Sequence, residues 1–246
     1  MKKLRTEFKN NLWTNAPARP VLSENEVHIW RASLDQPEID YAALLSADEQ
    51  ARAQRFLFEK DRRRFTVGRG TFRIILGRYL NSAPEELQFE YLARGKPVLR
   101  AGTLRFNLSH SHEMALYAIT RSLEVGIDIE YIRPIAETGK LAEQFFSPAE
   151  QAELGGLPSN KKLASFFSGW ARKEAYIKAR GDGMAYPLDQ FSVSMDCEQP
   201  ARLVDVKNAP QEAARWSLCD INPAPGYAGA LAVEGNSWNL VYWQFG

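Results

Sequence analysis

The chain has 246 residues, of which 45% are hydrophobic and 25% charged, as is usual for a globular protein that buries one large core or two small ones. The formal net charge of +1 gives the whole molecule no strong attraction to nucleic acid or to an anionic membrane. The polar, basic N-terminus lacks the apolar run of a signal peptide, and no segment has the roughly 20 apolar residues that a membrane span needs. Cys197 and Cys219 lie outside any Cys or His cluster, which favours reduced thiols in a cytoplasmic protein.

The first half of the chain alternates between strand and helix patterns. Residues 1–26 are polar, contain two prolines, and are predicted to form a loosely held, flexible arm. Ser46 and Glu49 form a capping-box pattern that begins a helix through about Phe58. The other predicted elements are a strand over 27–31, a helix over 61–80, and strands over 87–91, 105–108, 115–120 and 125–131.

The second half repeats the same order of patterns. Ser147, Pro148 and Glu150 combine an N-cap residue, a proline at the first helical position and a capping-box glutamate. A helix over 161–179 and strands over 191–195, 201–206, 215–220, 228–233 and 238–243 are predicted after it. We therefore expect an α+β fold of two similar lobes, residues 1–122 and 123–246.

Two carboxylates lie close together on the strand predicted over 125–131. Asp128 and Glu130 are two residues apart, so both side chains point to one face of the strand, while Ile127 and Ile129 point into a core. Adjacent carboxylates repel unless a cation lies between them, and oxygen ligands with open positions suit Mg²⁺. A pair of solvated acids on an edge strand is the alternative, and the pattern alone favours it.

The segment from Trp170 to Gly183 forms a second candidate site. On a helix, Glu174 and Lys178 lie four residues apart on one side, so Glu174 is a candidate third metal ligand and Lys178 a candidate phosphate contact. An ordinary surface Glu–Lys pair is the alternative, which the pattern alone again favours.

Basic residues are concentrated between Arg52 and Arg73, a region that includes Arg64. Such a density near a helix start suits phosphate binding. Contact with nucleic acid and a solvated helix face are the alternatives, but no nucleic-acid-binding motif accompanies the cluster.

A Ser-His-Ser sequence, Ser109 to Ser111, is predicted where a strand meets a turn. A nucleophilic triad is disfavoured because there is no G-x-S-x-G elbow and because adjacent Ser and His side chains do not easily point at each other. Hydrogen bonding from Ser109 and His110 to a phosphate is the simpler use of these side chains.

Taken together and in order, these motifs resemble the Sfp-type 4'-phosphopantetheinyl transferases. The resemblance covers roughly residues 50–195 and rests on GKP at 95–97, FNLSHS at 106–111, GIDIE at 126–130, FFSPAE at 145–150 and WARKEAYIKARGDGM at 170–184. It implies two pseudo-twofold-related lobes, each a small, mostly antiparallel sheet packed with helices, with coenzyme A bound in the cleft between them. It further implies transfer of 4'-phosphopantetheine from coenzyme A to an acyl or peptidyl carrier protein, with Mg²⁺ as cofactor.

The resemblance also implies roles for single residues. Asp128, Glu130 and Glu174 match the magnesium-binding acids, and Lys178 matches a lysine that contacts the pyrophosphate, which makes Glu174 and Lys178 the catalytic candidates. The residues that match or support coenzyme A contacts are Arg52, Arg64, Lys96, Ser109, His110 and Lys178. One departure is Glu49, which stands where the family often has a second basic residue.

Other functions are compatible with parts of this pattern. The main alternative is a non-catalytic module that binds coenzyme A or a carrier protein. A nucleic-acid-binding protein and a Mg²⁺-dependent phosphohydrolase are weaker alternatives. We expect no nucleic-acid or membrane partner, and we expect a monomer, because two lobes in one chain can build a complete site.

Overall fold

The computed structural model describes residues 13–35, 39–100, 102–181, 183 and 186–246. The helical elements are η1 (Tyr41–Leu44), α1 (Ala47–Ala53), α2 (Glu59–Leu80), η2 (Pro84–Glu86), α3 (Thr138–Phe145), α4 (Pro148–Gly156), α5 (Ser159–Arg180), η4 (Leu188–Gln190) and α6 (Glu212–Arg215). The strands are β1 (Thr14–Asn15), β2 (Glu26–Ser33), β3 (Phe89–Tyr91), β4 (Pro97–Leu99), β5 (Arg105–Ser111), β6 (Met114–Thr120), β7 (Val125–Tyr131), β8 (Phe191–Val193), β9 (Leu203–Val206), β10 (Trp216–Ile221), β11 (Tyr227–Glu234) and β12 (Asn239–Gln244).

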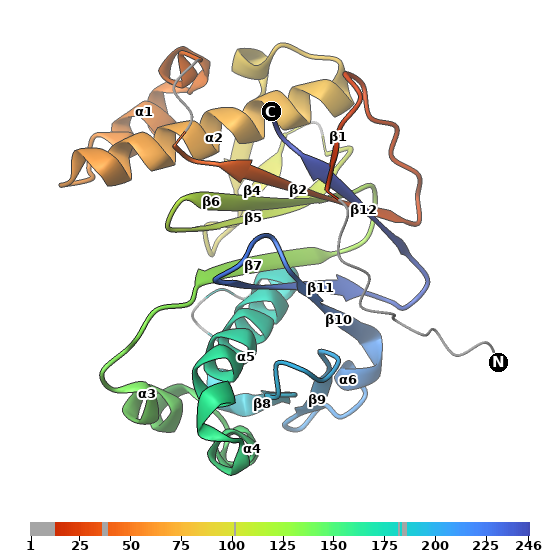
Figure 1. The fold of residues 1–246 in the computed structure, drawn as a ribbon. Coiled ribbons are helices and arrows are strands. Elements are labelled where there is room, and N and C mark those ends of the chain that lie inside the picture. The colour runs from red at the N-terminus through yellow and green to blue at the C-terminus, as the bar shows by residue number, and fades with distance from the viewer. Residues whose placement is uncertain (1–12, 36–38, 101, 182, 184–185) are drawn as a thin grey trace.

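Two sheets form the centre of the molecule, and one long helix covers each of them (Figure 1). The first sheet has the strand order β1-β12-β2-β6-β5 and carries α2, and the second has the order β10-β11-β7 and carries α5. In the described residues the first sheet is mixed, because β12 pairs in parallel with β1 and β2 while its other pairs are antiparallel. The second sheet is antiparallel. The predicted α+β class, with small sheets packed against helices, is confirmed.

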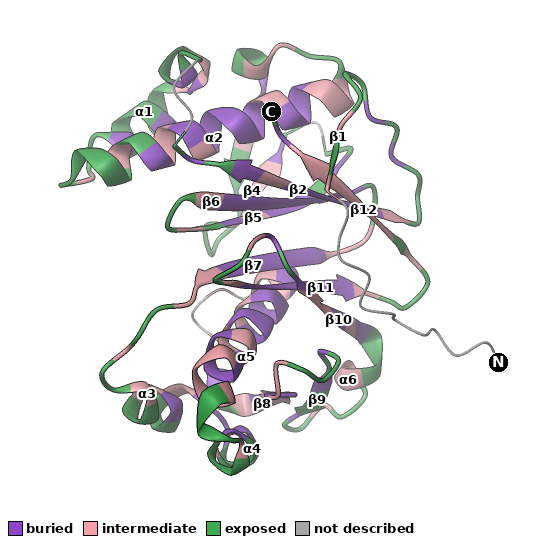
Figure 2. Ribbon diagram, viewed as in Figure 1, coloured by how far each residue is buried: buried purple, intermediate pink, exposed green. Residues whose placement is uncertain are grey.

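Alternation along the strands explains how the layers hold together. Val27 and Ile29 of β2 point toward the second sheet, where they pack with Ile127 and Ile129 of β7 in a core between the sheets. Trp30 points the other way and packs under α2. The inner strands therefore bury both faces, as the purple colouring in Figure 2 shows. The prediction that Ile127 and Ile129 point into a core is confirmed.

The two halves also repeat each other in detail. Helices α2 and α5 both have 22 residues, and each ends at a left-handed residue, Asn81 with φ 52° and Gly181 with φ 77°. Each half contains an S-x-x-E-Q sequence at the start of a short helix, SADEQ at 46–50 and SPAEQ at 147–151. Both predicted capping boxes are present.

The final amides of these motifs make equivalent contacts. Gln50 donates to the backbone carbonyls eight and five residues before it, and Gln151 does the same in the other half. Such matching hydrogen bonds support an internal repeat more strongly than the sequence alone.

Some predicted boundaries differ from the structure. The helix predicted to run through Phe58 ends at Ala53, because residues 54–58 form the turn that redirects the chain into α2. Strand β5 extends through Ser111, so Ser109 and His110 lie within a strand and not where it meets a turn. The strand predicted from Leu87 begins at Phe89, after η2.

The two sheets do not divide at residue 122, where the two predicted lobes meet. Strand β12, in the half predicted to form the second lobe, lies in the first sheet between β1 and β2. The described part of the predicted arm is also held, since β1 pairs with β12 and Leu22 is buried; residues 1–12 lie outside the described residues. Among the described helices, none is long and apolar enough to cross a membrane.

Candidate active site

Strand β5 brings a row of polar side chains to β7, although the two strands belong to different sheets. Asn107 and Ser111 each accept a hydrogen bond from a backbone amide of β7, at 2.9 and 3.0 Å. Between them, Ser109 Oγ donates to Asp128 Oδ1 at 2.8 Å. Because side chains two residues apart share one face of a strand, this row fixes Ser109 beside the carboxylate.

Gly126 lets helix α5 approach β7 from the opposite side. A Cβ at this position would lie 2.1 Å from the carbonyl oxygen of Ala175 and 2.3 Å from the backbone nitrogen of Ala179, so only glycine permits this approach. Asp128 lies two residues further along the same face of β7. The close approach therefore brings α5 residues 174 and 178 beside Asp128.

Lys178 and Ser109 share one oxygen of the Asp128 carboxylate. Lys178 Nζ lies 2.5 Å from Asp128 Oδ1 and 3.0 Å from Ser109 Oγ. Asp128 is buried, while the Lys178 side chain is 27% exposed, so the ammonium group lies between the core and solvent. The structure thus joins three residues that the sequence presented in three separate motifs.

Two carboxylate oxygens beside this cluster are buried without a partner in the described residues, Asp128 Oδ2 and Glu174 Oε1. Burial, and then the negative charge of Asp128, raises the pKa of Glu174 above its usual range. Such oxygens suit a cation, since Mg²⁺ in proteins is usually bound by one or two carboxylates together with substrate phosphates. Asp128 and Glu174 therefore fit a magnesium ion.

Glu130 lies at the edge of this cluster. Its Oε2 accepts a hydrogen bond from Ser111 Oγ at 3.2 Å, and burial together with the charge of Asp128 raises the pKa of Glu130 to about 7. Within the described ranges, no three Asp, Glu, His or Cys side chains lie close enough to form a metal site by themselves. The geometry thus supports two direct carboxylate ligands more clearly than three.

A cavity of about 330 Å³ opens next to Ser109 and extends under α1 and α2. Four of the predicted coenzyme A contacts line it: Arg52, Arg64, Ser109 and His110. Burial, and then the positive charges of Lys178 and Arg52, lowers the pKa of His110. The cavity therefore has a cationic wall and a neutral imidazole donor or acceptor near neutral pH.

The arginines of this wall differ in their partners. Arg64 lies 3.3 Å from Asp35 and 3.2 Å from Glu113, so its charge is shared with two exposed carboxylates. The Arg52 guanidinium lies 5.4 Å from the centre of the Phe65 ring, which also lines the cavity.

Lys96, which was predicted to lie near the nucleotide, contacts the end of α5. Its Nζ lies 3.4 Å from Glu124 and 3.3 Å from the carbonyl oxygen of Ala179, and burial lowers its pKa. Its neighbours Gly95 and Pro97 line the cavity, but Lys96 itself does not. In this conformation, Lys96 joins the β3–β4 hairpin to the end of α5.

Among the lining residues without a role predicted from the sequence are two with polar groups, Arg69 and Tyr91. Arg69 belongs to the basic region that was identified, but helical spacing alone did not show that it points inward. Tyr91 lies on the short strand β3, and its position depends on a hairpin whose packing against α2 has no local sequence signal.

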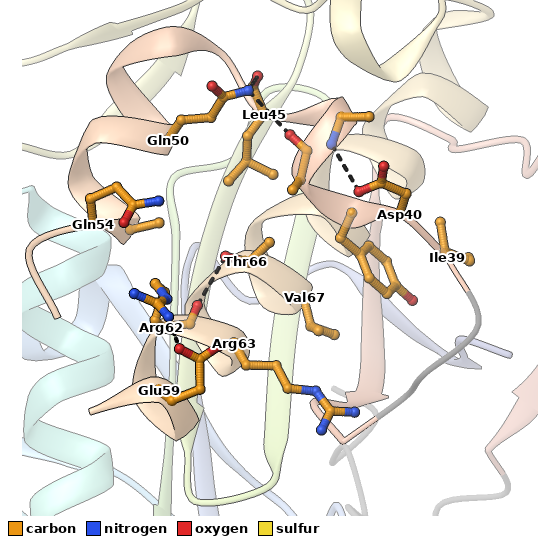
Figure 3. A pocket seen from close by; sticks show the side chains of 14 residues that line it. Ile39, Asp40, Leu45, Gln50, Gln54, Glu59, Arg62, Arg63, Thr66 and Val67 are labelled. Atoms are coloured by element: carbon orange, nitrogen blue, oxygen red, sulfur yellow. Dashed lines mark hydrogen bonds and ion pairs between the residues drawn. The ribbon is translucent and has the colours of Figure 1, made fainter. Parts of the chain in front are cut away.

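A larger hollow of about 710 Å³ lies between α1, η1 and the first half of α2 (Figure 3). None of the predicted site residues lines it. Several of its polar groups are used internally: Asp40 accepts from the backbone of Ala43, Gln50 donates to the backbone, and Arg62 pairs with Glu59. The smaller cavity next to Ser109 is therefore the better candidate site.

Comparison with known proteins assigns both halves of the chain. A family model described as the 4'-phosphopantetheinyl transferase superfamily matches residues 124–232, and one described as 4'-phosphopantetheinyl transferase, N-terminal, matches residues 28–122. The 4'-phosphopantetheinyl transferase HetI of Nostoc sp. is 43% identical over 95% of this chain and 98% of its own length.

Two further relatives match a smaller part of the chain. The 4'-phosphopantetheinyl transferase psf-1 of Bacillus pumilus is 38% identical over 71% of this chain and 74% of its own length. The 4'-phosphopantetheinyl transferase Sfp of Bacillus subtilis is 30% identical over 63% of this chain and 68% of its own length.

Proposed function

Because the chain belongs to the 4'-phosphopantetheinyl transferase superfamily, we propose that it moves the 4'-phosphopantetheine arm of coenzyme A onto a serine of an apo acyl or peptidyl carrier protein. The observation that carries the proposal is the position of Ser109. This residue lines the cationic cavity, and its hydroxyl also contacts both Asp128 and Lys178. A nucleotide in the cavity would therefore have its pyrophosphate next to the carboxylate–lysine cluster.

The cavity supplies the contacts that the nucleotide half of coenzyme A needs. Arg52 and Arg64 provide charge for the phosphates, and Ser109 and His110 provide hydrogen bonds. Lys96 would have to leave Glu124 to reach the nucleotide, so we place it at the edge of the binding site.

We assign the cofactor Mg²⁺ to Asp128 and Glu174, with Glu130 as a ligand through water or an orienting group. The support is the pair of buried, unpartnered oxygens on Asp128 and Glu174. When bound, the ion neutralises charge on the pyrophosphate of coenzyme A.

In the reaction that we propose, a carrier serine oxygen forms a bond to the phosphorus joined to pantetheine. The bond from that phosphorus to the bridging pyrophosphate oxygen breaks, and 3',5'-ADP leaves. Glu174 accepts the serine proton through its other carboxylate oxygen, Oε2, which leaves Oε1 for the ion, and Lys178 donates hydrogen bonds to the leaving phosphate. Most of the rate enhancement is expected from positioning and electrostatic stabilisation, as in other phosphoryl transfers.

We further propose a monomer that acts in the cytoplasm, with no nucleic-acid or membrane partner. The support is that one chain supplies both the cavity and the carboxylates, and that Cys197 and Cys219 are free thiols, as in proteins of reducing compartments.

The test is to incubate the protein with coenzyme A, Mg²⁺ and an apo carrier protein and to weigh the carrier by intact mass spectrometry. The expected result is a gain of one phosphopantetheine that EDTA prevents. Coenzyme A binding without any gain, across several carriers, would instead favour the non-catalytic binding module. Phosphopantetheine released without a carrier would indicate a hydrolase.

A further inference from the structure

Glu49 is one of the most deeply buried charged residues of the first half, with 1% of its surface exposed. One oxygen accepts a hydrogen bond from Arg69 Nε, and the other accepts from Arg73 Nε at 2.6 Å and from the Ser46 backbone at 3.0 Å. Glu49 therefore points toward the inside of the protein and does not line the cavity. The departure from the family pattern at this position has a structural role.

The two arginines connect Glu49 to the other walls of the cavity. Arg69 Nη2 donates to the hydroxyl of Tyr91 at 3.3 Å, and both residues line the cavity. Arg73 Nη1 donates to the carbonyl oxygens of Pro84 and Leu87, at 2.8 and 3.1 Å, in the segment that leads into β3. One carboxylate thus ties α1, α2 and the β3–β4 hairpin together.

Arg52 depends on the same carboxylate through helix α1. It lies three residues after Glu49, on the next turn of the same short helix, and it reaches the cavity. Because α1 has only seven residues, its anchorage to α2 through Glu49 sets where the Arg52 guanidinium lies.

The network also has an unbalanced charge. One carboxylate faces two guanidinium groups, and Arg69 and Arg73 are 7% and 1% exposed, so solvent screens them little. Arg69, the arginine of this network that lines the cavity, places positive charge at the cavity wall, where an anionic ligand would compensate it.

We propose that Glu49 is a positioning residue for the nucleotide: it holds Arg52 and Arg69 at the spacing that the phosphates of coenzyme A require, and the second arginine keeps the network positive. The inference rests on the proposed function. The other half contains a comparable buried carboxylate whose charged partner does not line the cavity, and this carboxylate allows a positioning role to be separated from a merely structural one. There, Glu150 is 1% exposed and accepts from Lys173 Nζ at 2.7 Å, and neither residue lines the cavity.

The experiment measures the Kd of 3',5'-ADP by isothermal titration calorimetry, without metal or carrier, for wild-type protein, Glu49→Gln and Glu150→Gln. Electrostatics alone predicts tighter binding for Glu49→Gln, because the change removes a negative charge beside the cavity. Loss of positioning predicts weaker binding. We expect Kd to rise about tenfold, because roughly one charged hydrogen bond to the nucleotide would be lost. Both substitutions are expected to lower the melting temperature, because each removes one partner of a buried ion pair. Glu150→Gln, however, is expected to leave Kd within about twofold of wild type.

In the transfer assay, Glu49→Gln is expected to raise KM for coenzyme A with little change in kcat, because positioning of the nucleotide is shared by ground and transition states. Arg69→Lys gives a second test if Glu49→Gln does not fold. It keeps the positive charge but loses the planar fork that spans Glu49 and Tyr91, so Kd should again rise, by at least about fivefold.

The outcomes are distinct. A folded Glu49→Gln protein that binds 3',5'-ADP as tightly as Glu150→Gln, or more tightly than wild type, overturns the positioning role, and so does unchanged affinity in Arg69→Lys. Wild-type protein that does not bind 3',5'-ADP overturns the proposed function together with this inference.

Discussion

Replacing Gly126 by alanine should separate the two parts of the candidate active site. The added Cβ would start 2.1 Å from the carbonyl oxygen of Ala175, whereas an ordinary contact is at least 3.4 Å, so α5 would have to retreat from β7 by about 1.3 Å. Overpacking of this kind typically destabilises a protein by about 1–3 kcal/mol. Because α5 carries Glu174 and Lys178, a displacement of about 1 Å is expected to lower the transfer rate by about 100-fold.

The assay combines urea unfolding with initial rates of carrier modification measured by mass spectrometry. Gly155→Ala is the matched control, because a Cβ there meets no atom within 4 Å and the residue lies in helix α4. Alanine in a helix is expected to stabilise the control by about 0.5–1 kcal/mol and to leave its rate unchanged. A Gly126→Ala protein with wild-type stability and rate would refute the idea that this close approach sets the site.

Three other perturbations test the electrostatics. Asp128→Asn should abolish transfer and weaken Mn²⁺ binding measured by calorimetry, while the far-ultraviolet circular dichroism stays that of the wild type. Lys178→Met, which removes the 2.5 Å contact to Asp128, should lower kcat by about 100- to 1000-fold, and an unchanged kcat would exclude Lys178 from catalysis. Burial lowers the pKa of His28, whose Nδ1 accepts from Trp243 Nε1 at 3.1 Å, so its contribution to stability should be complete above about pH 6.5 and decline as the pH falls toward the lowered pKa. The stability difference between wild type and His28→Gln, from urea unfolding at several pH values, should therefore shrink below about pH 6.5; a constant difference would contradict this assignment.

Local signals in the sequence were sufficient for most elements of the fold. The capping boxes at Ser46 and Ser147 and the alternation of β7 depend only on neighbouring residues, and each was confirmed. The end of α1 at Ala53 was not predictable in this way, because residues 54–58 contain no glycine or proline. The turn there depends on how α1 packs against α2, which is a tertiary effect.

The candidate site required long-range contacts that spacing does not encode. Ser109, Asp128 and Lys178 come from three elements, and only the resemblance to a known family associated them before the structure did so. The inward orientation of Glu49 was also hidden, because the capping-box pattern accounts for this residue without any contact to Arg69. Sequence patterns therefore identified the participating residues better than their partners.

The position of β12 has a consequence for how the chain folds as it is synthesised. This strand, six residues from 239 to 244, occupies an interior place in a sheet that otherwise consists of strands from the first half of the chain. Until residues 239–244 have left the ribosome, one side of β2 lacks its neighbour, and an unpaired strand edge is prone to wrong pairing. We therefore expect the first sheet to be completed only after β12 has left the ribosome, so that a strand made late finishes a sheet that much earlier strands begin.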